Sequence, residues 1–418
     1  MQSSRKLEFT IEARDVVVVR GMARTRLRVS PNLSQHVTQE RWESLPEYLA
    51  ETPGWARKGQ LLGLVSGPCR GYFSLIPESV AVRDARNPTR LFERGRDFEC
   101  DSEWGTLGRV VAGSIGGEQP VLVDYAYSLR RLDSIVEEAR GKLVLRQGTP
   151  HIATPEPPAL KAGETRLANL WWPKAAERLE ATQLFLIQEV VPPKPPRLAE
   201  QLLPQTLQKL TRGEPVTVLA WGDSVTGGYP GAVVWHRQVI DGLHTRFPKA
   251  KITTRVLGWG AHNMADFLAA PPSSPFHYAT QVLGSKPDLV ISEFLNDFVL
   301  PPDRWEPQYR RVHADFKALG AEWIALTPHY VWPGWMGLPS ERDCDRDPRP
   351  YVTFLREFCE RNGVALADAA ARYGQLWRKG IPFTTLMVNA VNHPNTAGMQ
   401  ILAESVLALF DGEKERSR

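Results

Sequence analysis

Three polar stretches of this sequence combine residue types that can carry out acyl transfer. A Gly-Asp-Ser run at 222–224 follows an apolar segment, and a serine on such a tight turn can present its hydroxyl to a substrate. Asn296 follows a second apolar segment, and its amide can donate hydrogen bonds to a developing oxyanion. His393 lies beside Pro394, which restricts the backbone, and a histidine held near a serine is a candidate general base.

Each stretch also has an ordinary structural explanation when it is considered alone. Ser224 fits a simple Asp-Ser turn or a helix cap, and an Asn-Asp pair often ends a strand. A single histidine in a loop is usually a surface residue. The functional hypothesis therefore depends on whether the fold brings the three residues together.

The elements predicted around these residues would bring them to one place. Beyond residue 195, apolar runs of strand length alternate with stretches of helical spacing, which is typical of a parallel sheet with right-handed crossovers. Strands are predicted at 216–221, 251–257, 288–293, 322–327 and 364–367, and helices at 198–210, 232–247, 303–319, 351–362 and 395–410. Ligands of such sheets bind beyond the carboxyl ends of the strands, where the serine and the asparagine are expected.

With these blocks in this order, the sequence resembles the SGNH (GDSL) hydrolase superfamily over residues 200–410. Ser224 matches the serine of its first block, Asn296 with Asp297 matches the third, and His393 matches the histidine of the last. The resemblance implies an α/β fold, namely a flavodoxin-like SGNH three-layer sandwich with a five-stranded parallel sheet.

The resemblance also implies a role for each matched residue. Ser224 would be the nucleophile and His393 the base that takes its proton. The oxyanion hole would consist of the backbone N–H of Ser224, a backbone N–H in the glycine block at 257–263, and the side chain of Asn296. Gly260 is the favoured residue of the glycine block and Ala261 is the alternative. No metal and no organic cofactor is expected.

One departure from the family pattern concerns the acid of the triad. The family usually has an aspartate three residues before the histidine, where this sequence has Ala390. If the extra asparagine of some relatives is counted, the acid position falls on Asn389, which is again not a carboxylate. We therefore expect a Ser–His dyad, with an inactive protein as the alternative. Residues considered for orienting the histidine or lining the pocket are Asn389, Asp297, His262, His329 and Trp332.

The first half of the chain has a different pattern, in which short β-rich runs alternate with Gly and Pro. Strands are predicted at 7–12, 15–20, 24–29, 61–65, 72–76, 108–111, 121–127 and 183–191, and one helix at 128–139. The proline-rich stretch 190–196 is typical of a stiff connector. The predicted organisation is an all-β, sandwich or jelly-roll-like domain at 1–190, a Pro-rich linker and helix at 191–212, and an SGNH hydrolase domain at 213–418.

Composition excludes several classes of function. Lys and Arg number 51 against 47 Asp and Glu, and the resulting +4 is no electrostatic footprint for nucleic acid. No apolar run approaches the roughly 20 residues of a membrane span. The polar start of the chain contains no apolar signal core, which fits either a cytoplasmic protein or a secreted one whose signal has been removed. The pattern leaves the compartment and the oligomeric state open.

The function expected from these observations is a serine esterase that removes O-acetyl or other short acyl groups from a carbohydrate. SGNH enzymes that follow a β-sandwich domain resemble carbohydrate esterases, and the aromatic loop around Trp332 could stack on sugar rings. A short-chain lipid or aryl esterase is the alternative within the enzyme class. A catalytically dead glycan-binding protein, or a structural part of a larger assembly, is the alternative outside it.

Overall fold

A computed structural model describes residues 7–188, 198–342 and 345–411. The contacts between residues divide the described chain into two compact units. One, the β unit, contains residues 7–188 together with Trp377–Val391, and the other, the α/β unit, contains residues 198–376 and 392–411. The predicted connector at 190–196 lies outside the described residues. The predicted organisation placed Trp377–Val391 in the domain at 213–418, whereas the contacts between residues place this segment in the β unit.

The α/β unit is built on a five-stranded sheet in which every neighbouring pair is parallel. Its strands are β16 (Pro215–Gly222), β17 (Lys251–Gly258), β18 (Leu289–Glu293), β19 (Glu322–Leu326) and β20 (Ala365–Ala367). They lie in the order β17-β16-β18-β19-β20, which is the 2-1-3-4-5 order of flavodoxin-like folds. The direction of chain progression reverses between β16 and β18, and this switch point is where such sheets bind ligands.

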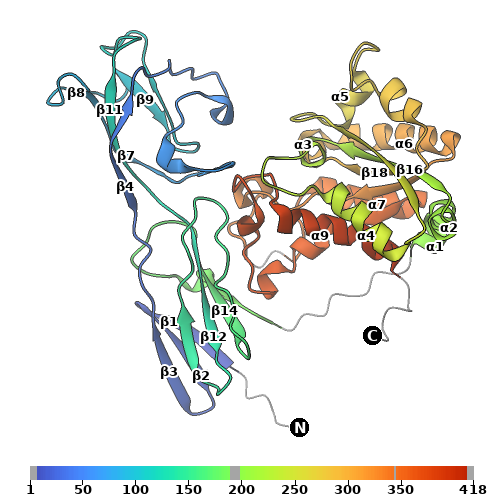
Figure 1. Cartoon of the computed structure of the whole chain (residues 1–418), viewed down its shortest axis with the longest axis horizontal. Coiled ribbons are helices and arrows are strands. Elements are labelled where there is room, and N and C mark those ends of the chain that lie inside the picture. Colours follow the sequence, from blue (N-terminus) through green and yellow to red (C-terminus); the bar gives the residue numbers. More distant parts are fainter. Residues whose placement is uncertain (1–6, 189–197, 343–344, 412–418) are drawn as a thin grey trace. The chain divides into compact units, whose positions relative to one another are not determined.

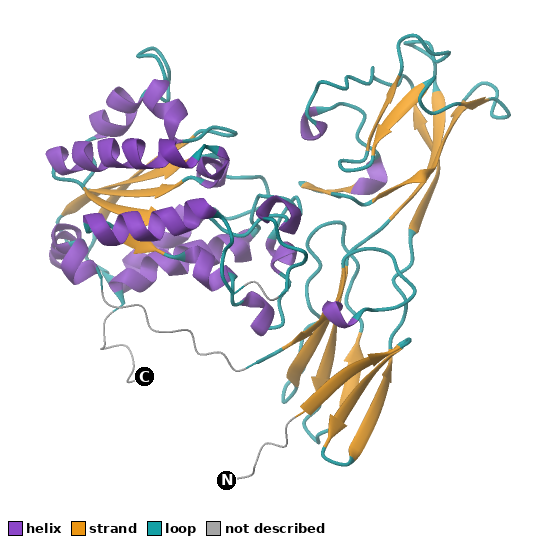
Figure 2. Cartoon of the chain, turned by 180° about the vertical axis from the view of Figure 1, so that it is seen from behind, coloured by secondary structure: helices purple, strands orange, loops and turns teal. Residues whose placement is uncertain are grey.

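Helices cover both faces of this sheet, which gives three layers (Figures 1 and 2). The helices are α1 (Ala199–Leu202), α2 (Pro204–Arg212), α3 (Ser224–Gly227), α4 (Trp235–Arg246), α5 (Met264–Ala269), α6 (Pro302–Leu319), α7 (Pro350–Asn362), α8 (Ala369–Tyr373) and α9 (Thr396–Leu407). The single helix predicted at 198–210 is wrong, because Pro204 disfavours a helical conformation at Leu203 and starts a new helix instead.

The core of the α/β unit is strongly aromatic on the face covered by α6 and α7. Trp221 of β16 is fully buried and contacts Phe267, Phe294 and Phe316 edge-to-face. Such pairs bury large apolar areas in a defined geometry. Helices α4 and α9 pack against each other on the opposite side of the sheet (Figure 1). Burial on both faces explains why the central strands are continuous apolar runs.

The β unit contains only antiparallel pairs within its named sheets. Its strands are β1 (Leu7–Glu12), β2 (Asp15–Arg20), β3 (Ala23–Arg28), β4 (Gln35–Trp42), β5 (Val65–Ser66), β6 (Cys69–Arg70), β7 (Leu75–Asp84), β8 (Leu91–Phe92), β9 (Phe98–Asp101), β10 (Thr106–Arg109), β11 (Val121–Tyr127), β12 (Arg131–Glu137), β13 (Leu143–Arg146), β14 (Thr165–Trp172) and β15 (Leu184–Leu186). Residues 61–65, predicted as a strand, mostly form a 3-10 turn at Leu62–Leu64.

Two hydrophobic clusters lie within the β unit. In the first, sheet β1-β2-β3 packs on sheet β13-β12-β14-β15 through residues such as Val16, Ile135 and Leu170, which makes a sandwich. In the second, sheet β4-β11-β7-β8 surrounds Val82, Val123 and neighbouring side chains. The predicted sandwich is therefore present, and residues 35–127 form a second β body within the same unit.

The helix predicted at 128–139 is wrong. Leu129, Leu132, Ile135 and Val136 have helical spacing, but residues 131–137 form strand β12 between β13 and β14. Six consecutive residues of this strand are buried, because both of its faces are covered. A strand buried on both faces loses the alternating pattern that distinguishes a strand from a helix in sequence.

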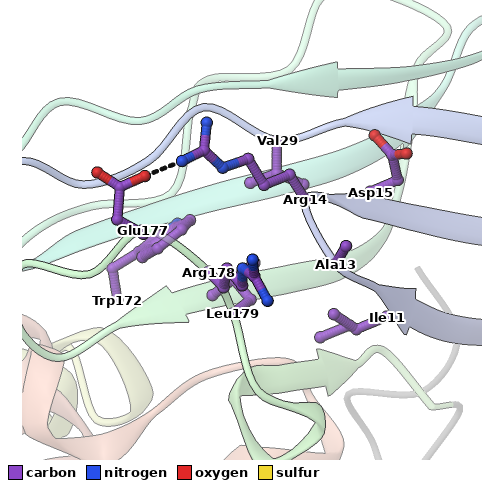
Figure 3. Close-up of a pocket in the computed structure, with 9 residues that line it drawn as sticks. All are labelled: Ile11, Ala13, Arg14, Asp15, Val29, Trp172, Glu177, Arg178 and Leu179. Carbon is purple, nitrogen blue, oxygen red and sulfur yellow. Dashed lines mark hydrogen bonds and ion pairs between the residues drawn. The ribbon is translucent and has the colours of Figure 1, made fainter.

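A shallow hollow lies at the edge of the sandwich, lined by residues of β1, β14 and the turns beside them (Figure 3). Arg14 and Glu177 form an ion pair across it, with the Arg14 side chain partly exposed and the Glu177 side chain largely exposed. Exposed pairs of this kind contribute about 0–1 kcal/mol to stability. The hollow contains no combination of groups that suggests chemistry.

Candidate active site

Ser224 lies directly beyond the carboxyl end of β16. Asp223 caps α3 by accepting a hydrogen bond from the backbone N–H of Val225 at 2.9 Å. Ser224 is the first residue of α3 and is partly exposed, whereas Asp223 and Val225 are buried. Gly222 is required here, because a Cβ on it would lie 2.0 Å from the carbonyl oxygen of Glu293. Within 222–225, Ser224 is therefore the residue that remains partly exposed.

His393 meets this serine from the other end of the sequence. Its Nε2 lies 3.0 Å from Ser224 Oγ, within hydrogen-bond distance. The ring of Tyr229 stacks on the imidazole with centroids 4.5 Å apart. Burial lowers the pKa of His393 to about 4, so the imidazole is neutral at pH 7. A neutral imidazole beside a hydroxyl can accept its proton.

Asn296 lies beyond the end of β18, across the switch point from Ser224. Its backbone N–H donates to the Asp223 carboxylate at 2.8 Å, which ties the two strand ends together. Its side-chain Nδ2 donates to the carbonyl oxygen of His262 at 3.1 Å. An amide nitrogen has two hydrogens, so one remains for a further acceptor.

The glycine block forms a turn after β17. A Cβ placed on Gly260 would lie 3.8 Å from Ser224 Cβ, so its backbone is adjacent to the serine. Ala261 follows with a φ of 61°, in the left-handed region that few residues other than glycine adopt. The ring of His262 stacks on Trp259, and its Nδ1 lies 2.6 Å from the Gly260 carbonyl oxygen. These contacts fix the shape of the turn beside the serine.

Three buried carboxyl groups lie beneath these loops. Asp223 is joined by Glu293 and Asp297, and none of the three is exposed. Burial raises the pKa of all three, to about 7 for Asp297 and well above the ordinary value for Glu293, which also faces the other two charges. Three adjacent charges are unfavourable away from water, so burial and the neighbouring carboxyl groups favour the neutral form of Glu293.

Asp297 was considered as a residue orienting the histidine or lining the pocket, and the structure gives it other partners. It accepts a hydrogen bond from the N–H of Met264 at 2.8 Å, at the start of α5. It also accepts from the hydroxyl of Tyr309 at 3.0 Å. Asp297 therefore joins the loop after β18 to the loop after β17 and to α6.

The remaining candidates fall into different environments. His329 is fully buried, so it does not line an open pocket as was considered from the sequence. Trp332 is partly exposed beyond β19, and the neighbouring Trp335 is 40% exposed. Asn389 is buried in the β unit, and its Oδ1 accepts from the N–H of Val391 at 3.0 Å.

No group of three or more His, Cys, Asp or Glu side chains could hold a metal ion among the residues that the structure describes. Within the same ranges, no helix is both long and apolar enough to cross a bilayer. Cys69, Cys100 and Cys359 are free, buried thiols, and Cys344 lies outside the described residues.

Two features of the site were not foreseen. Tyr229 follows a Gly-Gly pair and carries no signal that it stacks on a histidine 164 positions later. Glu293 belongs to the strand predicted at 288–293 and, with Phe294, resembles the sequence of sugar-esterase relatives; a glutamate at the end of a buried strand also signals an unusual environment. The stacking of Tyr229 on His393 and the proximity of Glu293 to Asp223 each join segments that are far apart in the sequence.

The arrangement is therefore a serine–histidine pair beside two hydrogen-bond donors, at the switch point of a flavodoxin-like sheet. No family model and no curated protein matches this chain. Comparison of structures finds SGNH-type and related esterases. Axe2, an acetylxylan esterase from Geobacillus stearothermophilus, has 23% identity and a TM-score of 0.40, covering 49% of this chain and 97% of that one.

Two further structures are similar to this chain. A two-domain esterase, CEX, active on acetylated mannans, has 17% identity and a TM-score of 0.41, covering 52% of this chain and 55% of that one. A protein described as a GDSL-like lipase from Parabacteroides merdae has 14% identity and a TM-score of 0.35, covering 46% and 94%. All three scores are below 0.5, so the function proposed next depends on the geometry of this site alone.

Proposed function

We propose that the protein is a serine esterase of the SGNH type that acts through a Ser224–His393 dyad. The observation that carries this proposal is the 3.0 Å distance between His393 Nε2 and Ser224 Oγ. A nucleophile and a base within hydrogen-bond reach, with the base neutral, is the combination that acyl transfer needs. Asn296 and the Gly260 turn supply donors on the same edge of the sheet.

The reaction would proceed in two halves. His393 takes the proton of Ser224 as Oγ attacks the ester carbonyl, and a tetrahedral oxyanion forms. The Asn296 amide and the backbone N–H groups of Ser224 and Gly260 donate to it, and each such donor contributes about 2.7–4 kcal/mol. His393 then protonates the leaving alcohol, and water attacks the acyl-enzyme by the same route.

For the substrate we propose an O-acetyl or other short acyl ester of a carbohydrate. The supporting feature is the segment after β19, at the same carboxyl edge as the serine, where Trp332 and Trp335 present partly exposed rings. Aromatic rings with one solvent-exposed face can stack on the apolar faces of sugars. A short-chain lipid or aryl ester is the competing substrate, and comparing acetylated xylan with p-nitrophenyl butyrate distinguishes them.

The experiment that tests the reaction is hydrolysis of p-nitrophenyl acetate by the wild type and Ser224→Ala. Ser285→Ala is the matched control, because its hydroxyl only donates to the Val282 carbonyl within a turn. We expect turnover by the wild type and the control, and loss of nearly all turnover in Ser224→Ala. Equal rates in all three proteins would overturn the proposal, and an inactive wild type would favour a glycan-binding or structural role.

A further inference from the structure

We propose that His329 is a positioning residue for the catalytic base: its imidazole donates Nε2–H to the carbonyl oxygen of Asn392 and so holds the loop that carries His393. This inference depends on the proposed role of His393. It addresses a specific gap, because the position where the family has an orienting carboxylate is Ala390 here. It concerns only contacts within the α/β unit.

The geometry gives His329 a direct link to the base. His329 follows β19 after two residues, and its Nε2 lies 2.8 Å from the Asn392 carbonyl oxygen. Asn392 directly precedes His393 in the chain. A carbonyl oxygen can only accept, so the hydrogen of this bond belongs to the imidazole. The bond therefore restrains the backbone one residue away from the base.

The surroundings of His329 keep its imidazole neutral and its backbone in place. It is fully buried, and burial together with the adjacent Arg349 cation lowers its pKa to about 3, so it stays neutral. Arg349 Nη2 also donates to the carbonyl oxygens of Pro328 and His329, at 3.2 and 2.9 Å, while its guanidinium pairs with Asp347. The backbone that presents His329 is thus anchored from a second direction.

An apolar residue would suit this position better if filling space were the only requirement. Nδ1 of His329 has no hydrogen-bond partner in the described part of the chain. A buried polar atom without a partner is destabilising, whereas replacing a buried polar group by an apolar one of similar shape is often neutral. Among the described residues, the one hydrogen bond of this side chain runs to Asn392. The destabilising burial of Nδ1 is explained if the bond from Nε2 to Asn392 is needed to hold the loop of His393.

Two contacts then restrain the base from different sides. Tyr229 stacks on the His393 ring, and His329 holds the backbone that leads into it. A displacement of about 1 Å at a reacting group can lower a rate about 10²-fold. Losing the restraint should therefore affect turnover more than substrate binding.

The test compares His329→Leu, which removes the donor, with His329→Gln, which retains an amide donor on a similar reach. Rates with p-nitrophenyl acetate are normalised to the amount of serine that reacts with a covalent organophosphate. We expect His329→Leu to lower kcat by about 10–10²-fold with KM within about twofold. We expect His329→Gln to recover most of the loss.

The outcomes separate this inference from the proposed function. If Ser224→Ala is inactive but His329→Leu keeps the wild-type kcat per reactive serine, only the positioning role is overturned. Equal losses in the Leu and Gln variants would also overturn it, since a structural role does not depend on the donor. If Ser224→Ala retains activity, the proposed function itself is wrong.

A measurement on the wild type covers the case in which His329→Leu does not fold. Imidazole ¹⁵N chemical shifts distinguish an Nε2–H from an Nδ1–H tautomer. We expect His329 in the Nε2–H form with no titration between pH 5 and 8, consistent with its lowered pKa. The Nδ1–H form would overturn the inference, because its Nε2 has no hydrogen to donate to the Asn392 carbonyl oxygen.

Discussion

At the residue scale, the protonation of the site is governed by the burial of His393, which lowers the pKa of its imidazole. His393 is only partly exposed, its Nε2 lies 3.0 Å from Ser224 Oγ, and burial favours its uncharged form. A base with a low pKa is available over a wide pH range but has a smaller driving force for taking a proton. In the proposed reaction, the surrounding donors would then provide much of the stabilisation of the transition state.

The first prediction concerns the acid limb of activity. The pKa of His393 is lowered to about 4, so the imidazole stays neutral as the pH falls from 7 and is protonated only near that value. We expect kcat/KM for p-nitrophenyl acetate to be level between pH 5 and 7 and to fall tenfold per pH unit below about pH 4. Assaying at pH 7 after exposure to pH 4 controls for denaturation. An acid limb centred near 6.5 would contradict the prediction.

The second prediction concerns the oxyanion hole. Asn296→Ala removes one donor while the backbone bond from residue 296 to Asp223 remains available. We expect kcat for p-nitrophenyl acetate to fall by about 10²–10³, with a small change in KM. Asn362→Ala is the control, since its side chain only donates to the Phe358 carbonyl in α7. A loss confined to KM would assign Asn296 to ground-state binding instead.

At the element scale, loops after three strands, β16, β17 and β18, are joined by the carboxyl groups beneath them. Asp223 connects the turn after β16 to the backbone of Asn296 after β18, and Asp297 connects that loop to Met264 at the start of α5. These bonds explain why the donors of the site are held together although they belong to separate elements. Buried carboxyl groups also make stability depend on pH.

The third prediction follows from that dependence. The pKa of Glu293 in the folded protein is raised well above its unfolded value of about 4.5, so its contribution is present at low pH and lost as the pH rises. We expect the wild type to have a lower free energy of unfolding at pH 8 than at pH 5. Glu293→Gln, which is neutral at every pH, should reduce this difference.

Urea denaturation at both pH values measures the prediction for Glu293. Glu306→Gln is the control, because this partly exposed carboxylate of α6 pairs with two cations, Arg310 and Arg361. An equal pH dependence in the wild type and Glu293→Gln would show that Glu293 does not titrate on unfolding in this range.

At the scale of the whole molecule, the chain passes between its two units more than once. Residues 198–376 belong to the α/β unit, Trp377–Val391 to the β unit, and residues 392–411 to the α/β unit again. Within the β unit, Asn169 Nδ2 donates to the Gly380 carbonyl oxygen at 2.6 Å and Gln188 N–H donates to the Arg378 carbonyl oxygen at 2.7 Å. The segment just before His393 is thus part of the β unit.

The fourth prediction tests this packing through Gly380. Its φ is 74°, and a Cβ would lie 2.7 Å from Ile187 Cγ1. Gly95 is a matched control, with a φ of 83° and open space around it. We expect Gly380→Ala to lower the free energy of unfolding by about 1–3 kcal/mol more than Gly95→Ala does, because only the first is also overpacked. Urea denaturation measures both variants. Equal losses of unfolding free energy would mean that segment Trp377–Val391 moves to accommodate the added methyl group without further destabilisation.

The sequence by itself was sufficient for the alternation of strands and helices beyond residue 213, and it indicated Ser224 and His393 as candidates for a catalytic pair. Strands β16 to β20 are short apolar runs between helical patterns, and these signals are local. The order of Ser224, Asn296 and His393 in blocks that resemble a known superfamily indicated where to look. The rule that parallel strands present their carboxyl ends at one edge then placed the first two together.

Only the tertiary structure decided the features that depend on contacts between distant segments. Strand β12 was predicted as a helix because burial on both faces hides its period, and only its pairing with β13 and β14 makes it a strand. The stacking of Tyr229, the bond from His329 to Asn392 and the place of Gly380 in the β unit each join residues more than 60 positions apart. No local pattern records such contacts, because they form only when the whole chain has folded.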